Sequence, residues 1–144
     1  MSLFRGEVFH TIDAKGRIIL PAKFRDALSG QFIITKGLDK CLFVFPMEEW
    51  KLLEEKAETT PLSNIDARKF NRFFFGGATE CECDEQGRIV IPPSLRQYAV
   101  LQKDIVTVGV VRRVEIWSRE GYENYFGDDT LDENISEKMT TFGI

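Results

Sequence analysis

The hydrophobic and polar positions along the chain divide it into short extended runs and a few helical segments. Residues 32–36 and 105–109 are rich in β-branched and aromatic side chains, and each is followed after a turn by a second apolar run, at 41–45 and 114–117. Runs of this composition between turn residues are typical of β-strands. Shorter strands are expected at 8–12, 18–20, 79–83 and 89–91. The pattern therefore predicts a core built mainly of strands.

Helical spacing is confined to the middle and the end of the chain. Apolar side chains three and seven residues after Trp50 share one face of a predicted helix over residues 47–58. A second helix is expected to begin with a capping box at Ser63 and Asp66. It carries a stripe of phenylalanines and ends before two glycines, near residue 75. Two further helices are expected at 120–126 and 131–141.

One stretch of the chain occurs twice. The sequence DAKGRIILPAKFR at 13–25 returns as DEQGRIVIPPSLR at 84–96, and after one inserted residue the match resumes by pairing Ile33 with Ile105. Each copy reads as a strand, an Asp-x-x-Gly turn, a β-branched run and then a proline, which suits the first turn of a helix. We therefore expect two copies of one β-rich unit in this chain, with a linker and a tail. The expected divisions are a first repeat at 4–50, a helical linker at 51–77, a second repeat at 78–122 and an acidic C-terminal tail or helix at 123–144.

The charge of the chain is unevenly distributed. The net charge is −4, from 19 basic and 23 acidic residues, and taken alone this balance argues mildly against a nucleic-acid partner. Most of the acidic excess lies beyond residue 119, however, whereas residues 5–45 are locally basic. A nucleic-acid contact through the N-terminal part therefore stays compatible with the sequence.

The cysteines and the histidine do not form a reactive or metal-binding set. Cys41, Cys81 and Cys83 are odd in number and are interpreted as reduced thiols in the cytoplasm. Cys81 and Cys83 alternate with glutamates, which predicts a strand with one buried face rather than a metal site. Only one histidine, His10, could act as a general base near neutral pH, and no phosphate-binding loop occurs. The sequence thus predicts no enzyme, no cofactor, no metal ion and no small-molecule substrate. It also contains no apolar run long enough to span a membrane.

The two turns resemble a known family. Asp13-Ala14-Lys15-Gly16-Arg17 and Asp84-Glu85-Gln86-Gly87-Arg88 are similar to the DxxxR turns of the AbrB/SpoVT looped-hinge-helix superfamily, and within it to the MraZ family. Support comes from the segments around them, and the resemblance covers residues 4–126. It implies an α+β fold: a duplicated looped-hinge-helix β-barrel formed by two intertwined, pseudo-symmetric halves, with flanking helices.

The same resemblance implies a function. Proteins of the MraZ family are sequence-specific, DNA-binding transcriptional regulators of the cytoplasm, associated with the nucleoid. They bind short direct repeats in double-stranded DNA upstream of their own division and cell-wall operon, and they assemble into ring-shaped homo-oligomers. Each of these properties is an expectation for the present chain.

Five residues are the expected DNA contacts. Arg17 and Arg88 would be the central cations, since arginine is the commonest partner of guanine in the major groove. Lys15 would contact a base or a phosphate, and Lys23 a phosphate, because cations that meet phosphates supply much of DNA affinity. Gly16 would let the backbone approach the DNA closely.

The remaining motif residues are expected to shape the turns. Asp13, Asp84 and Gly87 belong to this group. An aspartate and an arginine in one tight turn can also simply pair with each other. Such a structural role for the two arginines stays open beside the DNA role and is compatible with it.

The two copies differ in charge. Lys15 and Lys23 of the first copy are replaced by Gln86 and Ser94 in the second, so the two halves are not electrostatically equivalent. Arg25 and its counterpart in the second copy are expected to hold the shared barrel. The rival interpretation is a ring-forming scaffold that does not depend on DNA, and an antitoxin-like role is a weaker third. Dependence of DNA binding on Arg17 separates the regulator from the scaffold.

Overall fold

The strands and helices follow the predicted order closely. The computed structural model describes residues 3–127 and 131–144. Most predicted elements are found within one or two residues of their expected bounds, and the first strand begins earlier. The elements are β1 (Phe4–Thr11), β2 (Arg17–Ile19), α1 (Ala22–Arg25), β3 (Gln31–Lys36), β4 (Leu42–Pro46), α2 (Met47–Glu58), α3 (Ile65–Phe74), β5 (Thr79–Glu82), β6 (Arg88–Val90), α4 (Pro93–Tyr98), β7 (Asp104–Val111), β8 (Arg113–Ser118), α5 (Arg119–Phe126) and α6 (Leu131–Thr141).

Strands of the two repeats are interleaved in one sheet. The six-stranded sheet has the order β1-β7-β8-β4-β3-β5, and β2 pairs with β6 in a separate two-stranded sheet. All of these pairings are antiparallel. Exchanging each strand for its counterpart in the other repeat gives the same order read from the opposite end. The two repeats are therefore intertwined around a pseudo-twofold axis, as expected.

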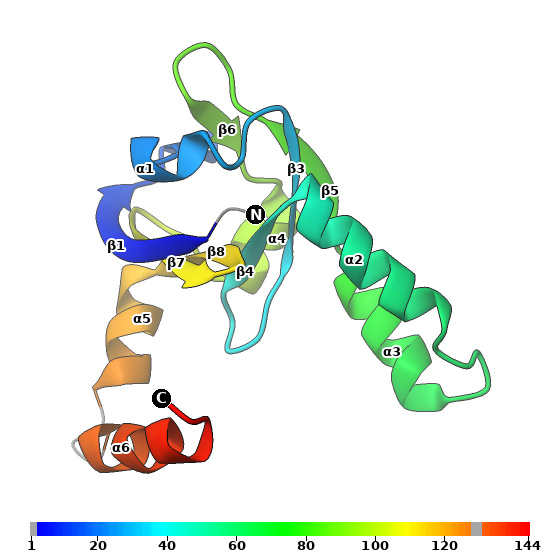
Figure 1. Cartoon of the computed structure of the whole chain (residues 1–144). Helices are drawn as coiled ribbons and strands as arrows, with labels where there is room; N and C mark the ends of the chain where they lie inside the picture. The colour runs from blue at the N-terminus through cyan, green and yellow to red at the C-terminus, as the bar shows by residue number, and fades with distance from the viewer. Residues whose placement is uncertain (1–2, 128–130) are drawn as a thin grey trace.

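The barrel expected from the family resemblance is not closed. Among the described strands, β1 and β5 are the two edges of the larger sheet, and no pairing joins them. The two-stranded sheet of β2 and β6 lies over one face instead (Figure 1). The fold is a mixed α+β arrangement with an open antiparallel sheet.

The strand register corrects the alignment of the repeats. Phe32 lies opposite Pro46, and Ile105 lies opposite Ser118. The counterpart of Ile105 is therefore Phe32, and the prediction that paired it with Ile33 is wrong by one residue. Counted between equivalent residues, the segment from Arg96 to Ile105 is two residues longer than the segment from Arg25 to Phe32. The turn between the paired residues Gly109 and Val114 is one residue shorter than the turn between Lys36 and Leu42. The two changes partly cancel, which hid the shift in the sequence.

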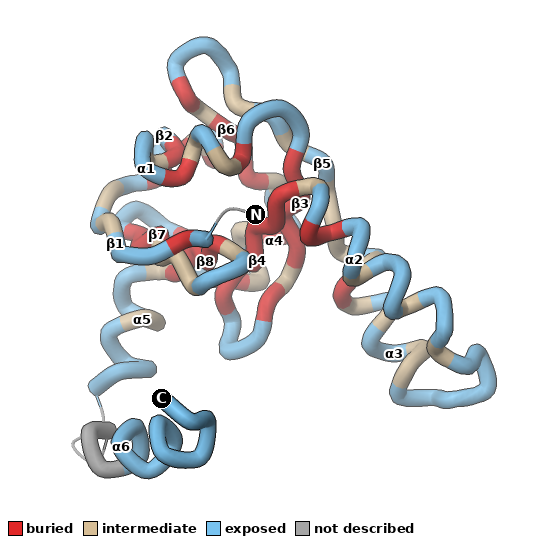
Figure 2. Tube along the Cα trace, in the orientation of Figure 1, coloured by how far each residue is buried: buried red, intermediate tan, exposed pale blue. Residues whose placement is uncertain are grey.

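Both faces of the large sheet are covered, so its central strands are buried on two sides (Figure 2). One face meets β2, β6, α1 and α4 in a cluster that contains Ile18, Ile89 and Leu95. The other face meets the first turns of α2 and the end of α3 in an aromatic cluster with Trp50 and Trp117. Burial on both faces explains why these strands read as continuous apolar runs. The edge strand β5 alternates half-buried and exposed positions instead, as its cysteines and glutamates predicted.

Helices α2 and α3 form a hairpin that extends away from the sheet (Figure 1). Stacking of Trp50 on Phe74, with ring centroids 5.4 Å apart, fixes the base of the hairpin. The predicted cap of α3 is displaced by one residue: Asn64, not Ser63, accepts hydrogen bonds from the backbone N–H groups of Asp66 and Ala67. An asparagine is as good an N-cap as a serine, so the spacing alone favoured the wrong residue. No helix in the described parts of the chain is long and apolar enough to cross a membrane.

Candidate nucleic-acid interface

The first Asp-x-x-x-Arg turn is built around one carboxylate. Oδ1 of Asp13 accepts the backbone N–H groups of Lys15 and Arg17, each at 2.9 Å. Oδ2 of the same carboxylate accepts the Nε–H of Arg17 at 2.7 Å. Gly16 adopts a φ of +81°, which a side chain would disfavour. The motif spacing is therefore explained by the turn, because one aspartate holds both the backbone and the arginine.

The second turn repeats this geometry. Oδ1 of Asp84 accepts the backbone N–H groups of Gln86 at 2.9 Å and Arg88 at 2.8 Å, and Oδ2 accepts the Nε–H of Arg88 at 2.9 Å. Gly87 has a φ of +78°. Pairing of aspartate with arginine, one of the two alternatives left open by the sequence, thus occurs in both copies.

These ion pairs are too exposed to be the main reason for the motif. The side chains of Arg17 and Arg88 are each 38% exposed, and an ion pair of this kind contributes about 0–1 kcal/mol to stability. Each pair uses the Nε–H of its arginine. The terminal Nη groups are not part of these two hydrogen bonds, so each guanidinium keeps further donors.

The structure brings the two arginines onto one ribbon. In the β2–β6 pair, Arg17 lies opposite Val90 and Arg88 lies opposite Ile19. The middle residue of each strand is buried, so the outer residues share the opposite face. Arg17 and Arg88 are therefore diagonal neighbours on a short exposed ribbon. We call this surface, formed by Arg17, Ile19, Arg88 and Val90, the arginine ribbon.

Other predicted contact residues lie at different distances from the arginine ribbon. Lys15 is exposed in the first turn, beside the ribbon, and Gln86 takes its place in the second turn. Lys23 lies on α1, where its ammonium group sits 5.6 Å from the centre of the Phe24 ring and packs against Gly6 of β1. Lys23 is thus set apart from the ribbon, at its side.

Two residues of the ribbon escaped the sequence reasoning. Ile19 and Val90 are each 56% exposed, although both belong to runs of apolar residues that were predicted as strands. The sequence carried no signal for this exposure, because the residues before and after them are also apolar and only their burial differs. The sequence could not show that both exposed faces coincide, because that follows only from the pairing of β2 with β6.

The hydrogen bonds around Asp13 and Asp84 have a measurable consequence. The pKa of each carboxyl lies below its ordinary value, because a backbone N–H of the arginine donates to it, and the guanidinium donates as well. A depressed pKa in the folded state means that the turn is stabilised above the ordinary aspartate range and loses this stabilisation as the pH falls through the folded-state pKa. By carboxyl NMR, we expect both midpoints below that of a free aspartate. In Arg17→Ala, the midpoint of Asp13 should rise while that of Asp84 stays; equal movement of both would show that the turns are not separate units.

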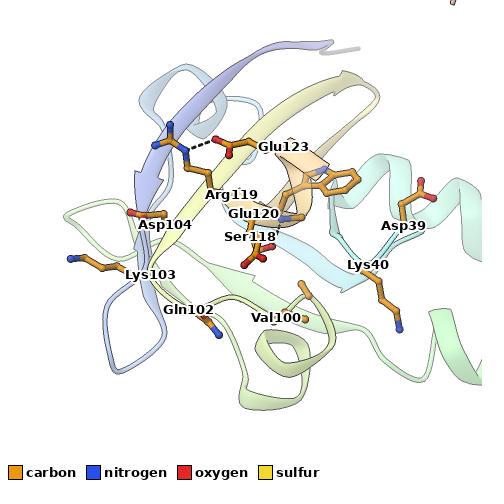
Figure 3. Close-up of a pocket in the computed structure, with 13 residues that line it drawn as sticks. Asp39, Lys40, Val100, Gln102, Lys103, Asp104, Ser118, Arg119, Glu120 and Glu123 are labelled. Carbon is orange, nitrogen blue, oxygen red and sulfur yellow. Dashed lines mark hydrogen bonds and ion pairs between the residues drawn. The ribbon is translucent and has the colours of Figure 1, made fainter. Parts of the chain in front are cut away.

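A hollow lies on a part of the surface other than the arginine ribbon (Figure 3). It has a volume of about 550 Å³ and lies between the start of α5 and the loops at residues 39–40 and 99–104. Its cations alternate with carboxylates, and Arg119 is turned toward Glu123 at 2.8 Å. Mixed charge of this kind does not favour a polyanion. The hollow is therefore a weaker candidate for DNA than the arginine ribbon.

The histidine and the cysteines are structural. His10 is half-buried and its Nε2 is 2.7 Å from Oγ1 of Thr107, and burial lowers its pKa. Cys41, Cys81 and Cys83 are free thiols whose pKa values are raised by burial. Among the side chains that the structure describes, no cluster of histidine, cysteine and carboxylate groups could hold a metal ion.

Fold and site together define a class of protein: a duplicated, interleaved β-rich protein whose repeats meet in an exposed arginine ribbon. The family model described as "MraZ protein, putative antitoxin-like" matches the chain twice, at residues 3–73 and 74–142. The chain belongs to the MraZ family, as its two turns predicted.

Similar proteins cover the whole chain. A protein of Natranaerobius thermophilus is 54% identical over 143 residues, 99% of this chain and 100% of its own length. One of Carboxydothermus hydrogenoformans is 56% identical over 141 residues, 97% and 99% of the two chains, and one of Clostridium tetani is 55% identical over 143 residues, 99% and 100% of the two chains. Each is named "Transcriptional regulator MraZ". These names describe regulators rather than enzymes and confirm the prediction of a non-enzymatic protein.

Proposed function

We propose that this chain is a sequence-specific, DNA-binding transcriptional regulator that acts in the cytoplasm on the nucleoid. It would bind short direct repeats upstream of its own division and cell-wall operon as a ring-shaped homo-oligomer. The observation that carries the proposal is the arginine ribbon, on which Arg17 and Arg88 are diagonal neighbours. The names of the relatives support the regulatory part.

The shape of the ribbon suits the major groove of DNA. That groove is about 12 Å wide and admits a two-stranded β-ribbon. A ribbon that enters it presents Arg17 and Arg88 to the base edges, where arginine pairs with guanine. Ile19 and Val90, exposed between the arginines, would contact thymine methyl groups. In this arrangement each turn, with Lys15 or Gln86, faces a DNA backbone.

Unequal halves favour a fixed orientation on the DNA. The ribbon is pseudo-symmetric, but Lys15 stands where the second turn has Gln86. A phosphate near the first turn therefore gains an attraction that the second turn lacks. Each protomer would bind in one direction, which matches direct repeats rather than inverted ones.

Oligomer formation would compensate for the few cations of one protomer. Several protomers on one DNA raise the effective concentration of each contact. The α2–α3 hairpin carries an apolar hollow of about 220 Å³ whose lining includes Leu53, Ala57 and Phe70, the last 48% exposed. Helix α6 exposes Ile135 and Met139, and Phe142 directly after the helix is also exposed. We propose that α6 of one protomer contacts the hairpin of the next, a head-to-tail contact that can close a ring.

Removal of α6 tests the assembly. We expect a chain that ends at residue 130 to sediment as a smaller species than the full chain. Phe70→Ala, on the other side of the proposed contact, should have the same effect. Both variants should keep the circular dichroism signal of the strands. An unchanged oligomer in both would place the contact elsewhere.

A DNA titration tests the regulator against the scaffold. The probe is a duplex from upstream of the gene for this chain, compared with a scrambled duplex at two salt concentrations. We expect the upstream duplex to bind more tightly and its affinity to fall steeply with salt, since bound cations release counterions. Arg17→Ala, run beside the wild type, should lose about 5- to 150-fold of the preference, the range of one base contact. Equal, weak binding of both duplexes would support the scaffold.

The division of the chain stays part of this proposal. Residues 4–50 and 78–122 would be the two DNA-facing repeats, in which a looped hinge joins the ribbon to α1 or α4. Residues 51–77 would be the linker, and residues 123–144 would serve assembly.

A further inference from the structure

Each Asp-x-x-x-Arg turn is in contact with an arginine of the other repeat. The guanidinium of Arg96, on α4 of the second repeat, packs directly on Gly16 in the first turn. A Cβ added to Gly16 would lie 2.7 Å from both Cζ and Nε of Arg96. The reverse contact is equivalent: a Cβ on Gly87 would lie 2.7 Å from Cζ of Arg25, on α1 of the first repeat. Both motif glycines are therefore required by a neighbour as well as by their own positive φ.

Backbone hydrogen bonds reinforce these contacts. The N–H of Ile91 donates to the carbonyl oxygen of Gly16 at 2.8 Å, and the N–H of Leu20 donates to that of Gly87 at 2.9 Å. Nε of Arg25 donates to the carbonyl oxygen of Leu20 at 2.8 Å. The second turn is thus attached to two connected residues of the first repeat. The first turn is attached to the second repeat by the bond from Ile91 and by the packing of Arg96 on Gly16.

We propose that Arg96 positions the first turn for DNA and that Arg25 positions the second, each across the repeat boundary and without contacting DNA. This inference rests on the proposed DNA-binding function. All four arginines are half-buried, but Arg25 and Arg96 lie on α1 and α4 against the glycines of the turns, whereas Arg17 and Arg88 lie on the arginine ribbon. A guanidinium that packs against the glycine of a turn fixes the backbone position of the next residue, which is the arginine expected to contact DNA. Specificity depends on such placement because base contacts tolerate little displacement.

The contact of Arg96 with the first turn and that of Arg25 with the second turn are unequal. Nε of Arg96 is buried and has no hydrogen-bond partner among the described residues, whereas Nε of Arg25 is bonded to Leu20. A donor left without a partner weakens the hold of its residue. The first turn, which carries Lys15, is therefore held less firmly than the second. This adds a mechanical difference between the halves to their difference in charge.

A double-mutant cycle tests the crossed pairing with the upstream duplex. Arg96→Ala is expected to weaken binding about tenfold, equivalent to about 1.4 kcal/mol. Combined with Arg17→Ala it should weaken binding no further than about twofold beyond Arg17→Ala alone, because the turn it positions has already lost its reader. Combined with Arg88→Ala, the two losses should multiply. Arg25→Ala should show the opposite pattern.

Other outcomes would overturn the proposal in recognisable ways. If Arg96 contacts a phosphate itself, its loss multiplies with both partners and the salt slope falls by about one. If Arg96 only stabilises the whole fold, both cycles deviate equally from additivity. A wild type that does not discriminate the upstream duplex would contradict the DNA-binding function but leave the positioning role to be tested separately.

Amide hydrogen exchange provides that separate test without DNA. In Arg96→Ala we expect the amides of residues 13–17 to exchange faster and those of residues 84–88 to keep their wild-type rate. Arg96→Lys, which keeps the charge but not the planar contact, gives the same comparison if the alanine variant does not fold. In the wild type, the first turn should exchange faster than the second. Equal acceleration of amide exchange in both turns would refute the proposal that Arg96 positions the first turn specifically.

Discussion

Replacing Arg17 and Arg88 together by alanine is expected to abolish the preference for the upstream duplex. Each arginine that pairs with a guanine contributes about 1–3 kcal/mol of discrimination, so the loss of two should be at least about 30-fold. The fold should survive, because both ion pairs are exposed and contribute little to stability. Affinity for the scrambled duplex should fall much less, since it depends on phosphate contacts. Competition titrations on the two duplexes measure both quantities.

A matched control separates recognition from the loss of charge. Arg68→Ala/Lys69→Ala removes the same number of cations from α3, in the hairpin that extends away from the sheet (Figure 1). This control should lower affinity for both duplexes by the same modest factor and leave the preference in place. If the control and the ribbon variant behave alike, net charge rather than the arginine ribbon governs binding.

The sequence predicted the components of the candidate site but not their assembly. Repetition of the motif identified Arg17 and Arg88 as equivalent residues, and the Asp-x-x-Gly spacing predicted the turns that hold them. Their meeting on one face depends on the antiparallel pairing of β2 with β6, two strands that are distant in the chain. The same holds for the crossed contacts of Arg25 and Arg96, which local sequence cannot encode.

The fold was predicted to a similar depth. Apolar runs located the strands, the repeat predicted two copies of one unit, and the family resemblance implied that the two halves are intertwined. Closure of a barrel came from the family resemblance alone, and the order of the strands leaves β1 and β5 as open edges. Loop lengths explain the shifted alignment of β3 and β7, since an insertion and a deletion that nearly compensate leave the apolar pattern almost unchanged. The apolar pattern of a sequence reveals composition and periodicity, whereas strand register depends on contacts between distant residues.

Intertwining of the repeats has a consequence for stability. Strands of one repeat pair with strands of the other along most of the sheet, so neither repeat can bury its apolar residues alone. Leu95 of the second repeat is 1% exposed and packs in a cluster with Phe24 and Ile18 of the first. Damage to the core of one repeat should therefore destabilise both repeats together.

Leu95→Ala tests this cooperativity. We expect it to lower the free energy of unfolding by about 2–5 kcal/mol, the cost of a buried leucine truncated to alanine. Leu62→Ala, the same change at a leucine that is 83% exposed, should stay within about 0.5 kcal/mol of the wild type. Urea titrations at one fixed protein concentration compare the two, because an oligomer has a concentration-dependent stability.

Trp50 and Trp117 report on the two repeats separately. Trp50 is the last residue of the first repeat and lies at the base of the hairpin, and Trp117 lies in β8 of the second repeat, each 5% exposed. In variants that keep only one of the two tryptophans, we expect Leu95→Ala to shift the unfolding midpoint of both reporters by the same amount, as a single cooperative transition requires. A shift confined to Trp117 would mean that the second repeat unfolds alone. Pairing between the repeats would then contribute less to stability than the contacts within each repeat. Each arginine of the ribbon would have to be positioned by residues of its own repeat.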